Sequence, residues 1–119
     1  MTKDGVKELL GYLYRNETLP SRFLGAEVRM SDVMAVIGAS LAADPVFPPK
    51  ALPQELGDGA IVERRGRFRY VVYDRYETGQ MQFSDVSTHS YLTLRGAVGR
   101  YLKHYRAHFK VHKVRIRWF

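Results

Sequence analysis

The 119-residue sequence contains no cysteine. This absence excludes disulfide bonds, thiolate zinc sites and a cysteine nucleophile. Long apolar runs are missing too: no stretch approaches the roughly 20 apolar residues of a membrane-spanning helix, and residues 1–16 lack the apolar segment of a secretory signal peptide. We therefore expect a soluble cytoplasmic protein that does not enter a membrane.

The common catalytic motifs are absent as well. The sequence has no P-loop, GxGxxG, GxSxG or HExxH motif, so nucleotide hydrolysis, dinucleotide binding and the usual hydrolase and zinc-protease mechanisms have no support. His89 lies in a run of hydroxyl side chains, but neighbours in sequence are rarely partners in a catalytic site. Three carboxylates in the same region have no spacing that singles them out: Asp74, Glu77 and Asp85. We predict a non-enzymatic protein without catalytic residues.

Four histidines raise the question of a metal site: His89, His104, His108 and His112. His104 and His108 are four residues apart, which places both on one face of a helix. The lysines and arginine around them would repel a cation, and no carboxylate falls within that segment to complete a site. We interpret these as surface histidines on a basic helix, and we predict no metal and no cofactor.

The sequence is rich in apolar and aromatic residues. An apolar fraction of 45%, with 8 Tyr, 6 Phe and 1 Trp, supplies enough side chains for a core, and 119 residues fit one domain. Residues 1–59 hold 6 of the 19 Lys and Arg and 8 of the 12 Asp and Glu, a net charge of −2. Residues 60–119 hold the other 13 and 4, a net charge of +9. The C-terminal half is therefore the part that attracts an acidic protein, nucleic acid or another anionic surface.

The first 59 residues predict two helices and an extended connection. Apolar residues at helical spacing predict a helix over residues 4–15, with Thr2 or Asp4 as its N-cap. A second helix is expected over residues 31–44, begun by Ser31-Asp32 and ended by Asp44-Pro45. Residues 45–59 hold four of the five prolines and predict an extended connection.

From Ala60 onward the pattern changes to the alternation that is typical of β-strands. We expect three antiparallel strands over residues 60–65, 67–77 and 80–88, turned at Arg65-Gly66 and Thr78-Gly79. One face of the hairpin is apolar and is expected to enter the core: Phe68, Tyr70, Val72, Tyr76, Met81 and Phe83. Asp74 has the same phase, so its carboxylate must lie near an edge or find a donor.

Residues 93–108 have the clearest helical pattern, with Thr93 as a plausible N-cap. Apolar and aromatic side chains form one stripe over three turns: Leu94, Ala97, Val98, Tyr101, Leu102 and Tyr105. Residues 113–118 alternate again and predict a last strand. The fold class is therefore α+β, a single domain of order α-α-β-β-β-α-β: two helices in residues 1–44, the proline-rich connection 45–59, and a sheet plus helix in residues 60–119. A mainly antiparallel sheet is expected to pack against the amphipathic helix, with the last strand at a sheet edge. The position of the first two helices and the oligomeric state stay open.

The opposite face of the predicted sheet carries the candidate partner-binding residues. Seven side chains share that phase: Arg67, Arg69, Tyr73 and Arg75 in the second strand, and Lys113, Arg115 and Arg117 in the last. Arginine donates two parallel hydrogen bonds to a carboxylate or a phosphate, and tyrosine can stack on a base. This face is predicted to bind an acidic protein or, alternatively, RNA or DNA, and an ordinary solvated face would give the same pattern.

Two segments, YVVYDRYETGQMQF (70–83) and GAVGRYLKHY (96–105), resemble the two-strand-plus-helix body of small bacterial immunity proteins from toxin–immunity systems. The resemblance covers about residues 67–105. It implies a cytosolic, non-enzymatic inhibitor that binds and occludes a cognate toxin. Immunity proteins against nucleases tend to be acidic, whereas this sequence is basic, so the resemblance implies a toxin with an acidic surface. No binding residues carry over from it.

Overall fold

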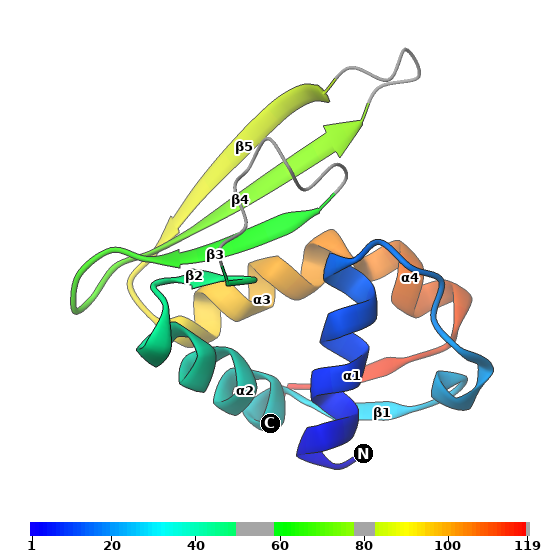
Figure 1. The fold of residues 1–119 in the computed structure, drawn as a ribbon. Coiled ribbons are helices and arrows are strands. Elements are labelled where there is room, and N and C mark those ends of the chain that lie inside the picture. The colour runs from blue at the N-terminus through cyan, green and yellow to red at the C-terminus, as the bar shows by residue number, and fades with distance from the viewer. Residues whose placement is uncertain (50–58, 78–82, 119) are drawn as a thin grey trace.

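A four-stranded antiparallel sheet lies above a layer of helices in the computed structural model, which describes residues 1–49, 59–77 and 83–118 (Figure 1). The helices are α1 (Lys3–Tyr14), the short 3-10 helix η1 (Ser21–Phe23), α2 (Met30–Ala43), α3 (Leu94–His104) and α4 (Arg106–Val111). The strands are β1 (Glu27–Arg29), β2 (Val46–Phe47), β3 (Ala60–Arg64), β4 (Tyr70–Glu77), β5 (Phe83–Tyr91) and β6 (Arg115–Arg117). The predicted α+β fold class is confirmed.

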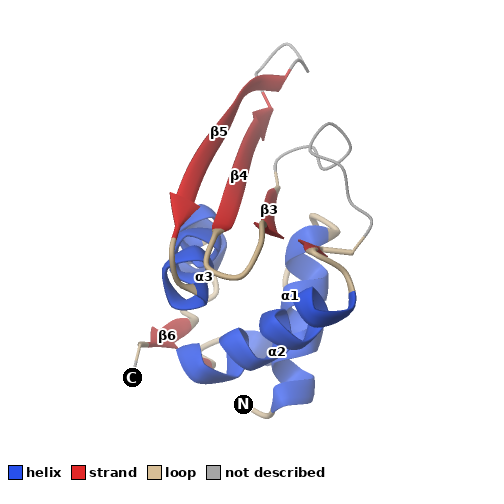
Figure 2. Cartoon of the chain, turned by 90° about the vertical axis from the view of Figure 1, so that its left-hand side faces the viewer, coloured by secondary structure: helices blue, strands red, loops and turns tan. Residues whose placement is uncertain are grey.

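Both N-terminal helices begin and end within one residue of the predicted bounds. The hydroxyl of Thr2 accepts from the Gly5 N–H at 3.1 Å and so caps α1. In α2, Gly38 faces α3, because a Cβ at this position would lie 3.2 Å from Leu94 Cδ2. The two helices join the same core as α3, which resolves the position that the sequence left open (Figure 2).

The main sheet has the order β2-β3-β4-β5, and every neighbouring pair is antiparallel. In its register Ala60 lies opposite Asp74 and Val62 lies opposite Val72. These residues are buried, and α3 packs against the sheet beneath them. The proposed turn at Thr78-Gly79 and the side chains of Tyr76, Met81 and Phe83 lie outside the part of the chain that can be described.

The predicted helical stripe of residues 93–108 is present, but the helix is interrupted. Thr93 caps α3, since its hydroxyl accepts from the Gly96 N–H at 3.1 Å. At Tyr105 the backbone leaves helical values, with φ −96° and ψ 15°, and α4 begins one residue later. The Tyr105 hydroxyl accepts from the backbone N–H of Ala60 at 3.1 Å. The interruption therefore coincides with a hydrogen bond between the helical layer and β3.

The last strand does not join the main sheet, so the predicted edge position is wrong. β6 pairs in parallel with β1, and the two form a separate two-stranded sheet. Val28 lies opposite Ile116, and Val28 is fully buried. Glu27 lies opposite Arg115, and its carboxylate is also within 3.3 Å of Arg117 Nη1. Apolar burial and opposite charges thus favour β1 as the partner of β6.

The second predicted strand begins later than expected, and one of its core residues is outside the core. β4 starts at Tyr70 rather than at Arg67, and Phe68 is 71% exposed. Residues 65–69 instead form the β3–β4 connection, closed by a hydrogen bond from the Arg65 N–H to the Arg69 carbonyl at 2.8 Å. Gly66 provides the positive φ of 77° that this turn needs. Phe68 therefore lies on a loop and is available for contacts.

Candidate functional site

The seven predicted binding residues do not lie on one surface. Lys113 lies in the turn between α4 and β6, and Arg115 and Arg117 belong to β6, which pairs with β1 rather than with the main sheet. The Arg115 guanidinium lies 3.8 Å from the Glu27 carboxylate, on the same side as Arg117. The expected continuous cationic face across both strands is therefore absent, because it depended on a pairing that the protein does not make.

The β4 residues of the predicted cationic face are largely buried. Arg75 is 7% exposed and is engaged in further contacts, and Val71 on the same face is buried. The half-buried Tyr73 accepts a hydrogen bond from the Arg65 guanidinium, which also donates to Glu63 at 2.7 Å. Burial raises the pKa of Tyr73, and the neighbouring Glu63 carboxylate raises it further. This surface does not offer the open aromatic and cationic side chains that base stacking requires.

Arg67 and Arg69 remain exposed, and they belong to a local cluster of arginines. We call residues Arg64–Arg69 the arginine loop, which projects from one end of the main sheet (Figure 1). Within the described ranges no carboxylate pairs with Arg64, Arg67 or Arg69, whereas Arg65 is paired with Glu63. The loop therefore presents three uncompensated positive charges.

Exposed apolar side chains accompany these arginines. Phe68, in the centre of the loop, is 71% exposed, and Leu92, which directly follows β5, is 74% exposed. Tyr70 and Tyr91 are opposite each other in the β4–β5 register, so the loop and Leu92 lie at the same end of the sheet. An aromatic residue and free arginines at one exposed end have the composition of protein-interface hot spots.

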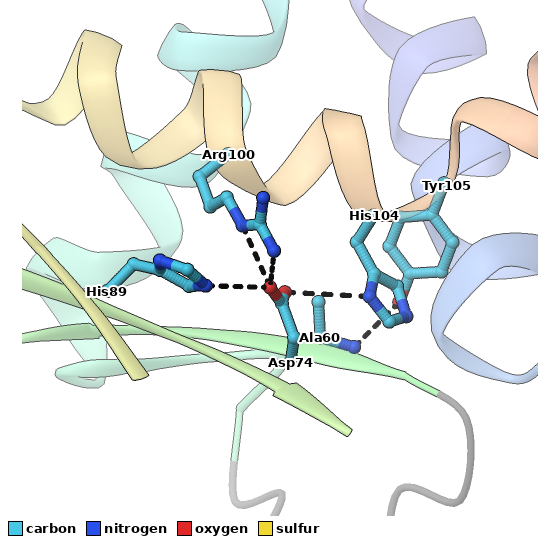
Figure 3. A network of polar contacts seen from close by, with 6 residues as sticks. All are labelled: Ala60, Asp74, His89, Arg100, His104 and Tyr105. Atoms are coloured by element: carbon cyan, nitrogen blue, oxygen red, sulfur yellow. Dashed lines mark hydrogen bonds and ion pairs between the residues drawn. The ribbon is translucent and has the colours of Figure 1, made fainter. Parts of the chain in front are cut away.

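A second cluster of polar residues lies inside, between the sheet and α3 (Figure 3). Asp74 of β4 is fully buried. Its Oδ2 accepts hydrogen bonds from two nitrogens of the Arg100 guanidinium on α3, with Nε at 2.8 Å. His89 of β5 places Nε2 at 3.3 Å from the same oxygen. His104 of α3 places Nδ1 at 3.5 Å from Oδ1. The donor that the phase of Asp74 required is thus supplied by Arg100 of α3.

The cluster fits a structural role better than a catalytic one. Burial alone would raise the pKa of Asp74, but the contacts from His104 and Arg100 outweigh it and hold that pKa below its ordinary value. Both carboxylate oxygens already face a cationic or imidazole nitrogen, so Asp74 is poorly placed to accept a proton from a substrate. Within the described residues no group of His, Asp and Glu side chains is arranged to hold a metal ion.

One histidine prediction is wrong. The His104 side chain is only 3% exposed and contacts the Tyr105 ring edge-on, with 4.9 Å between ring centroids. The sequence interpretation as a surface histidine rests on the basic residues that surround His104 in the chain. The missed signal is its spacing: His104 follows Arg100 by four residues, so both side chains extend from one face of α3 toward Asp74.

No family model, curated protein or solved structure matches this chain. None of the helices in the described ranges is both long and apolar enough to span a membrane.

Proposed function

We propose that this protein is a small, non-enzymatic binding module that occludes an acidic surface of a partner protein, as an immunity protein occludes its cognate toxin. The observation that carries this proposal is the arginine loop with Phe68 at its centre. Arginine and aromatic side chains dominate the energetics of protein interfaces, and a cationic surface accelerates encounter with an acidic one. The basic C-terminal half and the resemblance to immunity proteins support the same proposal.

The loop is also held in place before binding. The strands β3 and β4 pair directly on either side of it, and the hydrogen bond between Arg65 and Arg69 closes it. A loop that is already ordered loses less conformational entropy on binding, so more of its contact energy appears as affinity. Two of the exposed arginines, Arg67 and Arg69, can then form paired hydrogen bonds with carboxylates of the partner.

A complex with the protein product of the adjacent gene is the first test. We expect a complex of fixed stoichiometry by size-exclusion chromatography with light scattering, and relief of the partner's toxicity when both proteins are expressed together. Reversing two loop charges, Arg67→Glu with Arg69→Glu, should weaken binding by about 100-fold or more, because like charges at an interface cost several kcal/mol. Phe68→Ala should weaken it by about 30-fold, the effect of an aromatic hot spot.

The matched control is Lys3→Glu with Lys7→Glu on α1, which makes the same change in net charge on an exposed helix face away from the loop. This control should bind within about twofold of the unmodified protein, since distant exposed charges are screened by salt. If the control loses as much affinity as the loop variant, the loop is not the contact. If the purified protein instead binds random RNA or DNA with an affinity that falls steeply with salt, it is a nucleic-acid-binding module and the proposal is wrong.

A further inference from the structure

A groove runs between the α3–α4 helices and β6, separate from the arginine loop. It has a volume of about 500 Å³, within the range of binding pockets. Its lining is mainly apolar: Gly99, Leu102, Phe109, Val114, Ile116 and Trp118. Trp118 is 44% exposed at one end of the groove, against Gly99, where a Cβ would lie 3.3 Å from Trp118 Cζ3. The groove thus presents apolar surface, including an exposed indole, to solvent.

The helical side of this groove is cationic. Lys103, Arg106 and Lys110 line it and are exposed, and no carboxylate in the described part of the chain pairs with any of them. Arg106 and Lys110 are four residues apart in α4, so they lie about one helical turn, roughly 5 Å, from each other, and Lys103 precedes them at the end of α3. An apolar floor with a row of unpaired cations along one side is complementary to a ligand that is apolar on one face and acidic along its edge.

We propose that the groove binds an amphipathic helix of a partner protein, with an apolar stripe that contacts Trp118 and Ile116 and acidic residues that pair with the cationic row. A helix is the ligand whose own spacing matches this row, because its side chains recur every three and four residues. The inference stands independently of the arginine loop, whose residues do not line the groove.

The direct test uses the only tryptophan of the protein as its reporter. The probe is a synthetic 14-residue peptide without tryptophan, with leucines at helical spacing and glutamates along one flank. We expect saturable binding, a blue shift of Trp118 emission as the indole leaves water, and increased helicity of the peptide by circular dichroism. A peptide of the same composition in scrambled order should bind at least about tenfold more weakly, because it cannot place leucines and glutamates on separate faces.

Two variants separate the charged and apolar parts of the site. Lys103→Glu with Lys110→Glu should weaken peptide binding by about tenfold or more, while the matched reversal Lys3→Glu with Lys7→Glu should stay within about twofold. Trp118→Ala, followed by calorimetry because the reporter is lost, should weaken binding by about 30-fold if the indole is the main apolar contact. Thermal melting of each variant verifies that it is folded.

Several results would overturn the inference. Equal binding of the scrambled peptide, or equal loss in the Lys3 and Lys7 control, would show that only net charge matters. A response of Trp118 to anionic phospholipid vesicles but not to the peptide would assign the groove to lipid. Sedimentation showing a dimer that buries Trp118 would assign it to a second copy of the chain. Arg67→Glu with Arg69→Glu should leave peptide binding unchanged, so the groove and the arginine loop are tested separately, and either proposal can fail alone.

Discussion

At the scale of single residues, Asp74 places a full negative charge between a sheet and a helix. Its carboxylate is fully buried and is tolerated there because Arg100, His89 and His104 surround it. A buried ion pair adds little net stability over apolar packing, but loss of one partner leaves the other charge uncompensated. Asp74 therefore contributes to stability chiefly because its loss would leave Arg100 and the two histidines without their carboxylate. Its phase in the strand predicted that it needed a donor, whereas the identity of that donor required the position of α3.

We predict that Asp74→Asn lowers the free energy of unfolding by about 2–3 kcal/mol. This is below the largest values for buried pairs, because the partly exposed Arg100 can regain some hydration. Urea denaturation measures the change, with an unchanged slope indicating the same unfolding transition. Glu17→Gln is the control, since its pair with Arg15 is exposed and should contribute less than about 1 kcal/mol. Equal midpoints for Asp74→Asn and the unmodified protein would contradict the structural role of the cluster.

At the scale of helices and strands, local periodicity predicted most elements and the antiparallel order of β3, β4 and β5, but not the partner of β6. The apolar stripes of α1, α2 and α3 follow directly from residue spacing, because one face of each helix is buried. The spacing of β6 predicted a strand but carried no information about which strand it would join, since pairing depends on residues far away in the sequence. The predicted start of β4 was wrong for another reason: Phe68 continues the alternation of β4 in sequence, although the chain turns there.

The connection between α3 and β3 gives a test at this scale. Tyr105→Phe removes the hydroxyl that accepts from the buried Ala60 N–H, so this donor loses its partner. We expect a loss of about 1–3 kcal/mol in the free energy of unfolding, the cost of leaving a buried polar group unsatisfied. Tyr12→Phe is the matched control, because its hydroxyl accepts a long, exposed hydrogen bond of 3.4 Å from Arg22 and should change stability by less than about 0.5 kcal/mol. Amide hydrogen exchange at Ala60 should accelerate only in the Tyr105 variant.

At the scale of the whole molecule, the excess of positive charge is divided between two separate surfaces. The sequence predicted the excess in residues 60–119 and named Arg67 and Arg69 as candidate binding residues, but it predicted one continuous face. In the fold, β3–β4 carries one cationic cluster and α3–α4 carries another, while the β6 arginines face Glu27. A protein with two such surfaces can contact two regions of one partner, and binding both at once raises the overall affinity without any new contact.

The stability of the molecule should also depend on acid in a defined direction. The pKa of Asp74 in the folded protein lies below its ordinary value of 3.8, so the ionised carboxylate favours the folded state above that pH. This contribution is fully present above about pH 5 and is lost as the pH falls through 4 and below. The free energy of unfolding of the unmodified protein should therefore fall faster with acid than that of Asp74→Asn. Parallel curves for the two proteins between about pH 5 and pH 2 would show that Asp74 is not the group responsible.

The parallel pair of β1 and β6 has a consequence for how the chain is made. The ribosome synthesises Glu27–Arg29 early, whereas the strand that pairs with it, Arg115–Arg117, follows only after the main sheet and both C-terminal helices. Until then Val28 lacks the neighbour opposite it, and the apolar faces of α1 and α2 lack α3. Contacts between distant parts of a sequence form slowly and leave apolar surface exposed in the meantime. The N-terminal segment is therefore the part of the nascent chain that we expect to engage chaperones during synthesis.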